Sequence, residues 1–288
     1  MISRLVLVVI LGAFVACNTK QVSEEVEKKD WKLITAGGTV SEVVVSLGYL
    51  DQIIATDITS TFPASLQQLP SIGYRNQIKG EGLMALGADM ILAEEGYLTE
   101  DVLAQLTLTG IQVHLFKKPT AINETYRLIE EIASFLEEEE KGNELILQLQ
   151  ADHAALQTYL QANPLADPPA VAFIMARGLE TVFLAGDETF AAEIIQMAGA
   201  KPAGTGFKDF IPLTPEALVS MNPDYLLFFD SGLGTIGGKD GVQQIKGVNQ
   251  TTAFQQGNIL SFDGQYLSGF GPRVAQAALD LAKAIRKN

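Results

Sequence analysis

A tyrosine followed directly by an arginine, Tyr74-Arg75, has the side chains best suited to binding chemistry in this sequence. A phenolate is a hard anionic oxygen donor that suits Fe(III). A free phenol has a pKa near 10, which must fall before it binds a metal at neutral pH, and both the metal and a nearby cation favour this. Arg75 and Lys79 are close enough in sequence to supply that cation. The alternative is that Tyr74 packs in a turn between a loop and a sheet.

Two glutamates, Glu81 and Glu216, occupy matching places in an internal repeat. The segments 81–92 and 216–227 align without a gap and share Glu, Leu, Asp and Leu at an offset of 135 residues. That offset is far too long for a solenoid, so the repeat indicates a duplicated lobe. Each glutamate falls at the start of an expected helix, where the helix dipole favours a carboxylate, so a capping role is also open.

The single cysteine, Cys17, follows a short apolar run at residues 5–14. Ten helical residues reach only about 15 Å, half of a bilayer core, so the run predicts a signal-peptide core and not a membrane span. The segment resembles a bacterial lipoprotein signal, which implies cleavage before Cys17 and its lipidation. Phe14 replaces the usual leucine, which leaves an ordinary secretory signal as the alternative. We expect a signal peptide at 1–16, and the lipidated cysteine with a flexible tether at 17–30.

Composition and charge narrow the function classes. The chain has 288 residues, of which 47% are hydrophobic and 19% are charged, so it can bury a core in two domains. The net charge of −14 argues against nucleic acid, whose binding depends on neutralising phosphates. If its only thiol is acylated, the mature protein has no disulfide, and packing must stabilise it.

Strand-like and helix-like segments alternate from Trp31 onwards, which predicts an α/β architecture with mainly parallel sheets. The expected strands are Lys32–Ala36, Gln52–Thr56, Met90–Ala93, Val113–Phe116, Val171–Ile174, Val182–Leu184, Tyr225–Phe229 and Ile259–Phe262. We expect an N-terminal lobe at 31–136, a linking helix at 137–163 and a C-terminal lobe at 164–288.

A helical stretch from Ala121 to Ala162 lies between the two sets of strands. It has no proline and one glycine, and Gly142-Asn143 is expected to break it into two helices. The run of four glutamates from Glu137 to Glu140 is interpreted as a solvated face near that break.

The other motifs in the sequence do not support dinucleotide binding, a bare metal site or catalysis. The run Gly232-Leu-Gly-Thr-Ile-Gly237 matches a dinucleotide-binding pattern, but Gly238 and Gly241 oppose an immediate helix and no acidic residue follows about 20 positions on. We expect a flexible loop at the rim of a cleft there. The two histidines are too few and too scattered for a zinc or manganese site, and no G-x-S-x-G elbow is present, so we predict that the protein is not an enzyme.

Two similar α/β lobes joined by a long helix, exported and lipid-tethered, resemble the substrate-binding proteins of metal-chelate ABC importers. This group has a rigid helical backbone and carries siderophores, cobalamin or haem. The resemblance covers residues 31–288. It implies two Rossmann-like lobes, small lobe movements, a permease dimer with its ATPase as partner, and docking of the permease by Glu81 and Glu216.

The segment 69–82 resembles the haem-binding branch of that group, in which a Gly-Tyr pair precedes the docking glutamate by seven residues. Tyr74 stands seven residues before Glu81, so the resemblance implies that Tyr74 binds haem iron. That branch has an arginine two residues after the tyrosine, whereas this chain has Asn76 there and Arg75 before it. The direction of Arg75 is therefore open, and Asn76 would donate a weaker, neutral hydrogen bond.

The second lobe also resembles the group, at residues 204–216 and in the element Leu267-Ser-Gly-Phe-Gly-Pro-Arg273. His114, on an expected strand, and His153, on the linking helix, are interpreted as structural, so we expect five-coordinate iron. Met175 and Arg177 follow a strand and could face the cleft. Arg177 could hold a haem propionate or lie in solvent.

These inferences predict an extracytoplasmic, lipid-anchored, monomeric protein that binds haem and delivers it to an ABC importer. Two alternatives remain at this point. A siderophore or cobalamin binder would use Tyr74 as a wall of the cleft, and a haem-sequestering surface lipoprotein would act without a permease.

Overall fold

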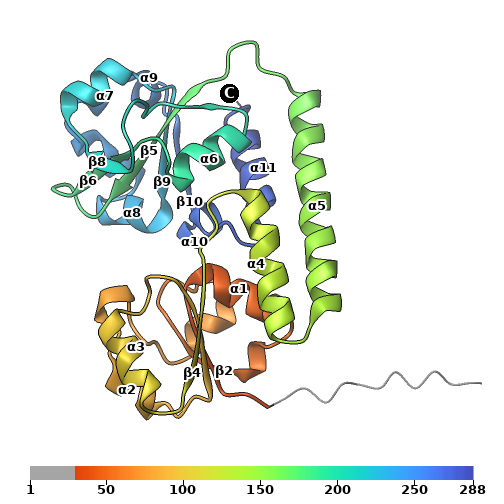
Figure 1. Cartoon of the computed structure of the whole chain (residues 1–288). Coiled ribbons are helices and arrows are strands. Elements are labelled where there is room, and N and C mark those ends of the chain that lie inside the picture. Colours follow the sequence, from red (N-terminus) through yellow and green to blue (C-terminus); the bar gives the residue numbers. More distant parts are fainter. Residues whose placement is uncertain (1–29, 288) are drawn as a thin grey trace, which may run out of the picture. The chain divides into compact units, whose positions relative to one another are not determined.

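The chain forms two β-sheets with helices packed around them (Figure 1). The computed structural model describes residues 30 to 287, except for the side chain of Asn76. The first sheet is parallel, with the strand order β2-β1-β3-β4. The second has the order β10-β9-β5-β6-β8, with β7 paired to β5. In it β10, β9, β5 and β7 pair in parallel, and β6 and β8 add antiparallel pairs. The predicted two-lobe α/β class is therefore confirmed.

The strands coincide with the apolar runs of the sequence, because a strand covered on both faces is a continuous apolar segment. All eight expected strands are present, and the short β7 and β8 were not predicted. The strands are β1 (Leu33–Ala36), β2 (Ile53–Thr56), β3 (Met90–Glu94), β4 (Gln112–Phe116), β5 (Ala170–Ala176), β6 (Val182–Ala185), β7 (Lys201–Pro202), β8 (Phe210–Pro212), β9 (Tyr225–Phe229) and β10 (Ile259–Phe262).

Helices connect the strands and cover the sheets. Several begin at a threonine whose side chain accepts a hydrogen bond from the first turn, as Thr99, Thr189 and Thr214 do. The helices are α1 (Gly38–Ser46), α2 (Gly80–Ala85), α3 (Glu100–Thr107), α4 (Ile122–Phe135), α5 (Glu139–Ala162), α6 (Phe190–Met197), α7 (Pro215–Met221), α8 (Asp230–Thr235), α9 (Thr252–Gln255), α10 (Gly264–Ser268) and α11 (Val274–Ala284). A short 3-10 helix, η3, spans Arg75–Gln77.

The long helix α5 joins the lobes and packs against α4 of the first lobe and α11 of the second (Figure 1). The predicted break at Gly142-Asn143 is wrong, because the chain turns at 136–138, where Glu137 has φ 58°. Gly142 instead lies inside α5 and lets it approach α4 closely. A Cβ atom added at Gly142 would lie 2.4 Å from that of Ala133.

The glycine-rich segment after β9 is helical, so the predicted flexible loop is wrong. Residues Asp230–Thr235 form α8, and Gly232 is buried against β5. A Cβ at Gly232 would lie 3.0 Å from the carbonyl oxygen of Ala176. The glycine therefore serves close packing of a helix on a strand.

None of the helices in the described part of the chain is both long and apolar enough to cross a bilayer. Cys17, the predicted signal peptide at 1–16 and most of the predicted tether lie outside the described residues.

Candidate functional site

A pocket of about 790 Å³ lies where the carboxyl ends of strands from both sheets meet. In open α/β sheets this edge is the usual place for a ligand, because loops and helix N-termini gather there. The first lobe contributes Gly38, Thr39, Ile58, Thr59, Thr61, Tyr74, Arg75, Glu94, Tyr97 and Lys118. The second contributes Met175, Ala176, Arg177, Phe190, Phe210, Phe229, Ser231, Gly232, Thr235, Asp263, Gly264, Gln265, Ser268 and Gly269.

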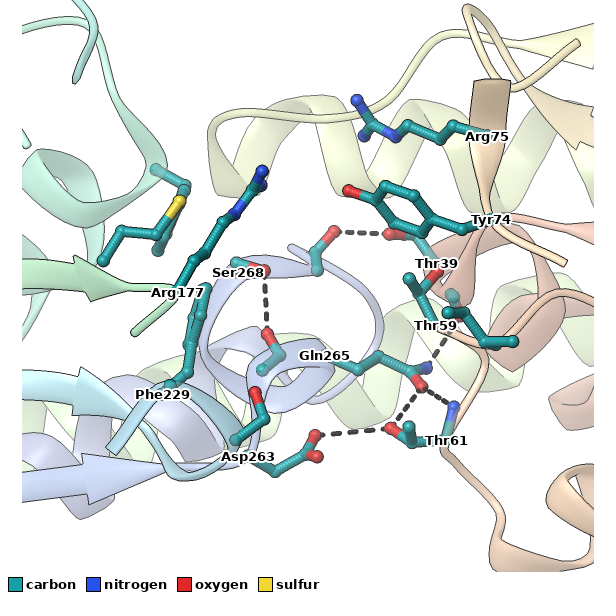
Figure 2. Close-up of a pocket in the computed structure, with 18 of the residues that line it drawn as sticks. Thr39, Thr59, Thr61, Tyr74, Arg75, Arg177, Phe229, Asp263, Gln265 and Ser268 are labelled. Atoms are coloured by element: carbon teal, nitrogen blue, oxygen red, sulfur yellow. Dashed lines mark hydrogen bonds between the residues drawn. The ribbon is translucent and has the colours of Figure 1, made fainter. Parts of the chain in front are cut away.

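Tyr74 lies on this lining, immediately before η3. The preceding Gly73 has φ 94°, a conformation that favours glycine, so the Gly-Tyr pair forms the turn that directs the tyrosine. Tyr74 is half-buried, and Figure 2 shows its phenol pointing into the pocket beside Arg75. The phenol oxygen is therefore available to a ligand in the pocket.

Arg75 also lines the pocket, so the arginine's shift by one residue does not turn it away from the cleft. Its guanidinium lies 4.7 Å from the centre of the Tyr97 ring. Burial lowers the pKa of this group, but the neighbouring Tyr97, Tyr74 and Glu94 outweigh it, and the pKa lies above its ordinary value. Arg75 therefore stays a cation beside Tyr74. The side chain of Asn76 is not described.

Two further cations face the pocket. Arg177 is exposed and enters from the side opposite Tyr74 (Figure 2), and Lys118 follows β4 in the first lobe. Neither forms an ion pair with the residues that the structure describes. Both can therefore pair with an anionic ligand. Lys118 was not predicted, although its place after an expected strand was a usable signal.

The second lobe supplies an apolar wall of three phenylalanines, which sequence analysis did not single out. The rings of Phe190 and Phe229 are stacked, with centres 5.5 Å apart and planes 11° apart. Phe210 lies 5.9 Å from Phe190 and also faces the pocket. This wall suits a flat, apolar ligand.

The side chain of Gln265 ties the two lobes together at the pocket. Its Oε1 accepts from the backbone nitrogen of Thr61 at 2.7 Å (Figure 2). The same oxygen accepts from the backbone nitrogen of Phe62 at 2.9 Å, and Nε2 donates to the carbonyl oxygen of Gly38 at 2.7 Å. The Thr39 hydroxyl also donates to the carbonyl oxygen of Gly269 at 2.6 Å. The two walls of the pocket therefore have a fixed spacing at this point.

The histidines lie elsewhere. His114 is half-buried on β4, with its ring centre 4.1 Å from that of Phe135, and His153 lies on α5 near Gln157. Neither lines the pocket. Among the described residues, no cluster of three or more His, Cys, Asp or Glu could hold a bare metal ion.

Glu81 and Glu216 lie outside the pocket. Both are exposed, in the first turns of α2 and α7, and each helix leads into a buried strand of its own lobe. The repeat seen in the sequence therefore corresponds to equivalent places in the two lobes.

Several known proteins share this fold or part of this sequence. The structure superposes on the periplasmic haem-binding protein RhuT from Roseiflexus sp. RS-1 with a TM-score of 0.85 and 30% identity, covering 89% of this chain and 98% of that one. An ABC transporter substrate-binding lipoprotein, YvrC of Bacillus subtilis, is 23% identical over 90% of this chain and 81% of its own length. The vitamin B12-binding protein of Yersinia pestis is 25% identical over 59% of each chain. The family model described as "Periplasmic binding protein" matches residues 33–266, and the chain therefore belongs to that family.

Proposed function

We propose that this protein binds haem in the cleft and delivers it to an ABC importer, with the Tyr74 phenolate bound to ferric iron. The observation that carries the proposal is a phenol directed into a pocket whose opposite wall is aromatic. A hard phenolate matches Fe(III), and stacked phenylalanine rings match the faces of a porphyrin. The similarity to a haem-binding protein at 30% identity supports the same ligand.

The cations of the pocket complete the match. Haem carries two propionate carboxylates, and a guanidinium or ammonium group pairs well with a carboxylate. Arg177 and Lys118 come from different lobes and are available for this role. Arg75 lies beside Tyr74, where a positive charge favours the phenolate over the phenol.

The experiment that tests this function is a hemin titration of the purified full-length protein, followed by absorbance, beside Tyr74→Phe. We expect a saturable high-spin ferric spectrum with a phenolate charge-transfer band for the wild type, and loss of that band in the variant. A wild-type spectrum identical to that of free hemin would contradict the proposal.

Cobalamin is a second candidate, supported by the similarity to the vitamin B12-binding protein. Its cobalt needs no phenolate, so Tyr74 would act only as a wall. Saturable binding of cyanocobalamin, unchanged by Tyr74→Phe and without a hemin signal, would favour this ligand. A siderophore as the ligand would be detected by a competition experiment, in which its ferric complex displaces hemin from the protein.

Delivery requires a partner in the membrane. We propose that Glu81 and Glu216 dock on the two permease subunits, since two equivalent lobes can present one carboxylate to each half of a twofold partner. We also propose that Cys17 carries the lipid anchor and that the protein acts outside the cytoplasm. The family and the lipoprotein relative support this location.

A further inference from the structure

A second tyrosine, Tyr97, lines the same pocket but differs from Tyr74 in its surroundings. It follows β3, and only 4% of its surface is exposed. Burial is the main cause that raises the pKa of Tyr97 to about 12, and the charge of Glu94 adds to it. Its hydroxyl is also engaged with Thr59, so Tyr97 is a poorer candidate than Tyr74 for binding iron as the phenolate.

Tyr97 belongs to a chain of hydrogen bonds that ends at the carboxylate of Asp57. Because this carboxylate can only accept, it decides which group donates in each bond of the chain. Asp57 accepts from the backbone nitrogens of Gly37 and Thr59, both at 2.8 Å, and from the Ser60 hydroxyl at 2.7 Å. The Thr59 hydroxyl also donates to Asp57 Oδ2. A carboxylate with four donors has no proton to give, so Thr59 is committed as a donor to it.

The same reasoning identifies the donor in the hydrogen bond between Thr59 and Tyr97. Its hydroxyl lies 2.9 Å from Thr59 Oγ1. Because the single hydroxyl proton of Thr59 goes to Asp57, Tyr97 must be the donor in this bond. The Tyr97 hydroxyl therefore anchors its ring to Thr59 and, through Thr59, to Asp57.

Arg75 lies against the face of this anchored Tyr97 ring. The guanidinium carbon lies 4.7 Å from the ring centre, within cation–π range. Arg75 Nε has no hydrogen-bond partner among the described residues, so the protein does not use all of its donors. The guanidinium of Arg75 is therefore held beside Tyr74, and its Nε–H makes no hydrogen bond within the described part of the protein.

We propose that Tyr97 is a positioning residue, which holds Arg75 beside Tyr74 so that the guanidinium stabilises the phenolate on haem iron. This inference rests on the proposed haem-binding function. It assigns different tasks to the two tyrosines: Tyr74 binds iron as the anion, and Tyr97 orients the cation that favours that anion.

The test is the pH at which the iron–phenolate band disappears on acidification, because protonation of the ligand releases it from iron. Less stabilisation by Arg75 makes protonation easier, so the midpoint should rise. We expect Tyr97→Phe, which keeps the ring but loses the hydrogen bond to Thr59 that anchors it, to raise the midpoint by roughly half to one pH unit, a threefold to tenfold change in proton affinity. Thr59→Val should shift it in the same direction by less.

A double-mutant cycle separates positioning from a general structural effect. In an Arg75→Leu background, Tyr97→Phe should cause no further shift. The matched control is Tyr266→Phe, since Tyr266 lies 5.0 Å from the guanidinium of Arg273 and donates to Asp280 at 2.9 Å without lining this pocket. Its midpoint should equal that of the wild type. An unchanged midpoint in Tyr97→Phe, or an equal shift in both backgrounds, would overturn the inference.

A measurement without haem keeps the inference independent of the ligand. In the apo protein, the Arg75 Nε–H signal in ¹⁵N NMR, identified by its loss in Arg75→Lys, should exchange slowly with water. Tyr97→Phe should make that exchange at least several-fold faster. Equal exchange in both proteins would overturn the positioning role, whereas a missing phenolate band in the wild type would overturn only the proposed haem function.

Discussion

The carboxylate of Glu42 and the guanidinium of Arg273 form a two-point ion pair between the lobes. Arg273 Nε lies 2.7 Å from Oε1 of Glu42, and Nη2 lies 2.9 Å from Oε2. Glu42 is on α1 of the first lobe, and Arg273 immediately precedes α11 of the second. The guanidinium also stacks on the ring of Phe62, 3.5 Å from its centre. Together with Gln265, this pair holds the lobes together beside the pocket.

Breaking this pair should destabilise the whole protein. The side chain of Glu42 is only 5% exposed, so Glu42→Ala leaves the charge of Arg273 without its partner in a mostly buried place. We expect the free energy of unfolding in urea to fall by about 2–4 kcal/mol. The control is Asp167→Ala, which removes the exposed pair with Lys201 and should cost less than about 1 kcal/mol. Equal losses in the two variants would show that the interlobe pair adds little.

The strands could be predicted because they depend on local sequence, since buried parallel strands are continuous apolar runs. The place of Tyr74 was implied by the resemblance of residues 69–82, because local sequence alone also allowed a tyrosine packed in a turn. The break between α4 and α5 could not be predicted in this way. Gly142 looks like a helix breaker in sequence, but its role depends on Ala133, which packs against it from the preceding helix.

The rest of the site depends on contacts between distant segments. Arg75 faces the cleft because Tyr97 and its hydrogen-bonded partners hold it, and those partners come from loops after other strands. The wall of Phe190, Phe210 and Phe229 looks like ordinary core in sequence, since nothing local separates a buried phenylalanine from one lining a cavity. The sequence around Asp57 contains no motif that would mark its role, apart from its position directly after β2.

Charge reversal at Glu81 and Glu216 should separate binding from delivery. Both glutamates are exposed and outside the pocket, so the double variant Glu81→Arg/Glu216→Arg should bind hemin with unchanged affinity. Haem uptake in cells that depend on this protein should fall at least tenfold, because the proposed docking would lose both carboxylates and meet positive charges in their place. Glu100→Arg, another exposed glutamate in a first helical turn, is the control. Unaltered uptake in the double variant would rule docking out.

Replacement of the pocket cations should weaken the binding of propionates specifically. We expect Arg177→Ala and Lys118→Ala each to raise the dissociation constant for hemin by about fivefold, the effect of one partly exposed charge pair. Haem dimethyl ester lacks the carboxylates, so its affinity should be the same in the wild type and in both variants. The control is Lys246→Ala, since Lys246 is exposed and does not line the pocket. An equal loss for hemin and for the ester would contradict propionate pairing.

Glu124 should make the loop that carries Lys118 sensitive to acid. Hydrogen bonds from the backbone nitrogen of Thr120 and from Lys117 lower the pKa of Glu124 to about 2, with burial opposing them. A carboxyl whose pKa is depressed on folding stabilises the protein above its unfolded value of about 4.5, and this contribution is lost as the pH falls towards 2. Glu124→Gln should therefore lower the unfolding free energy by about 1 kcal/mol at pH 7, with the difference vanishing near pH 2. Urea titrations of both proteins between pH 7 and pH 2 measure this, and a difference that persists at pH 2 would assign the effect to packing and not to charge.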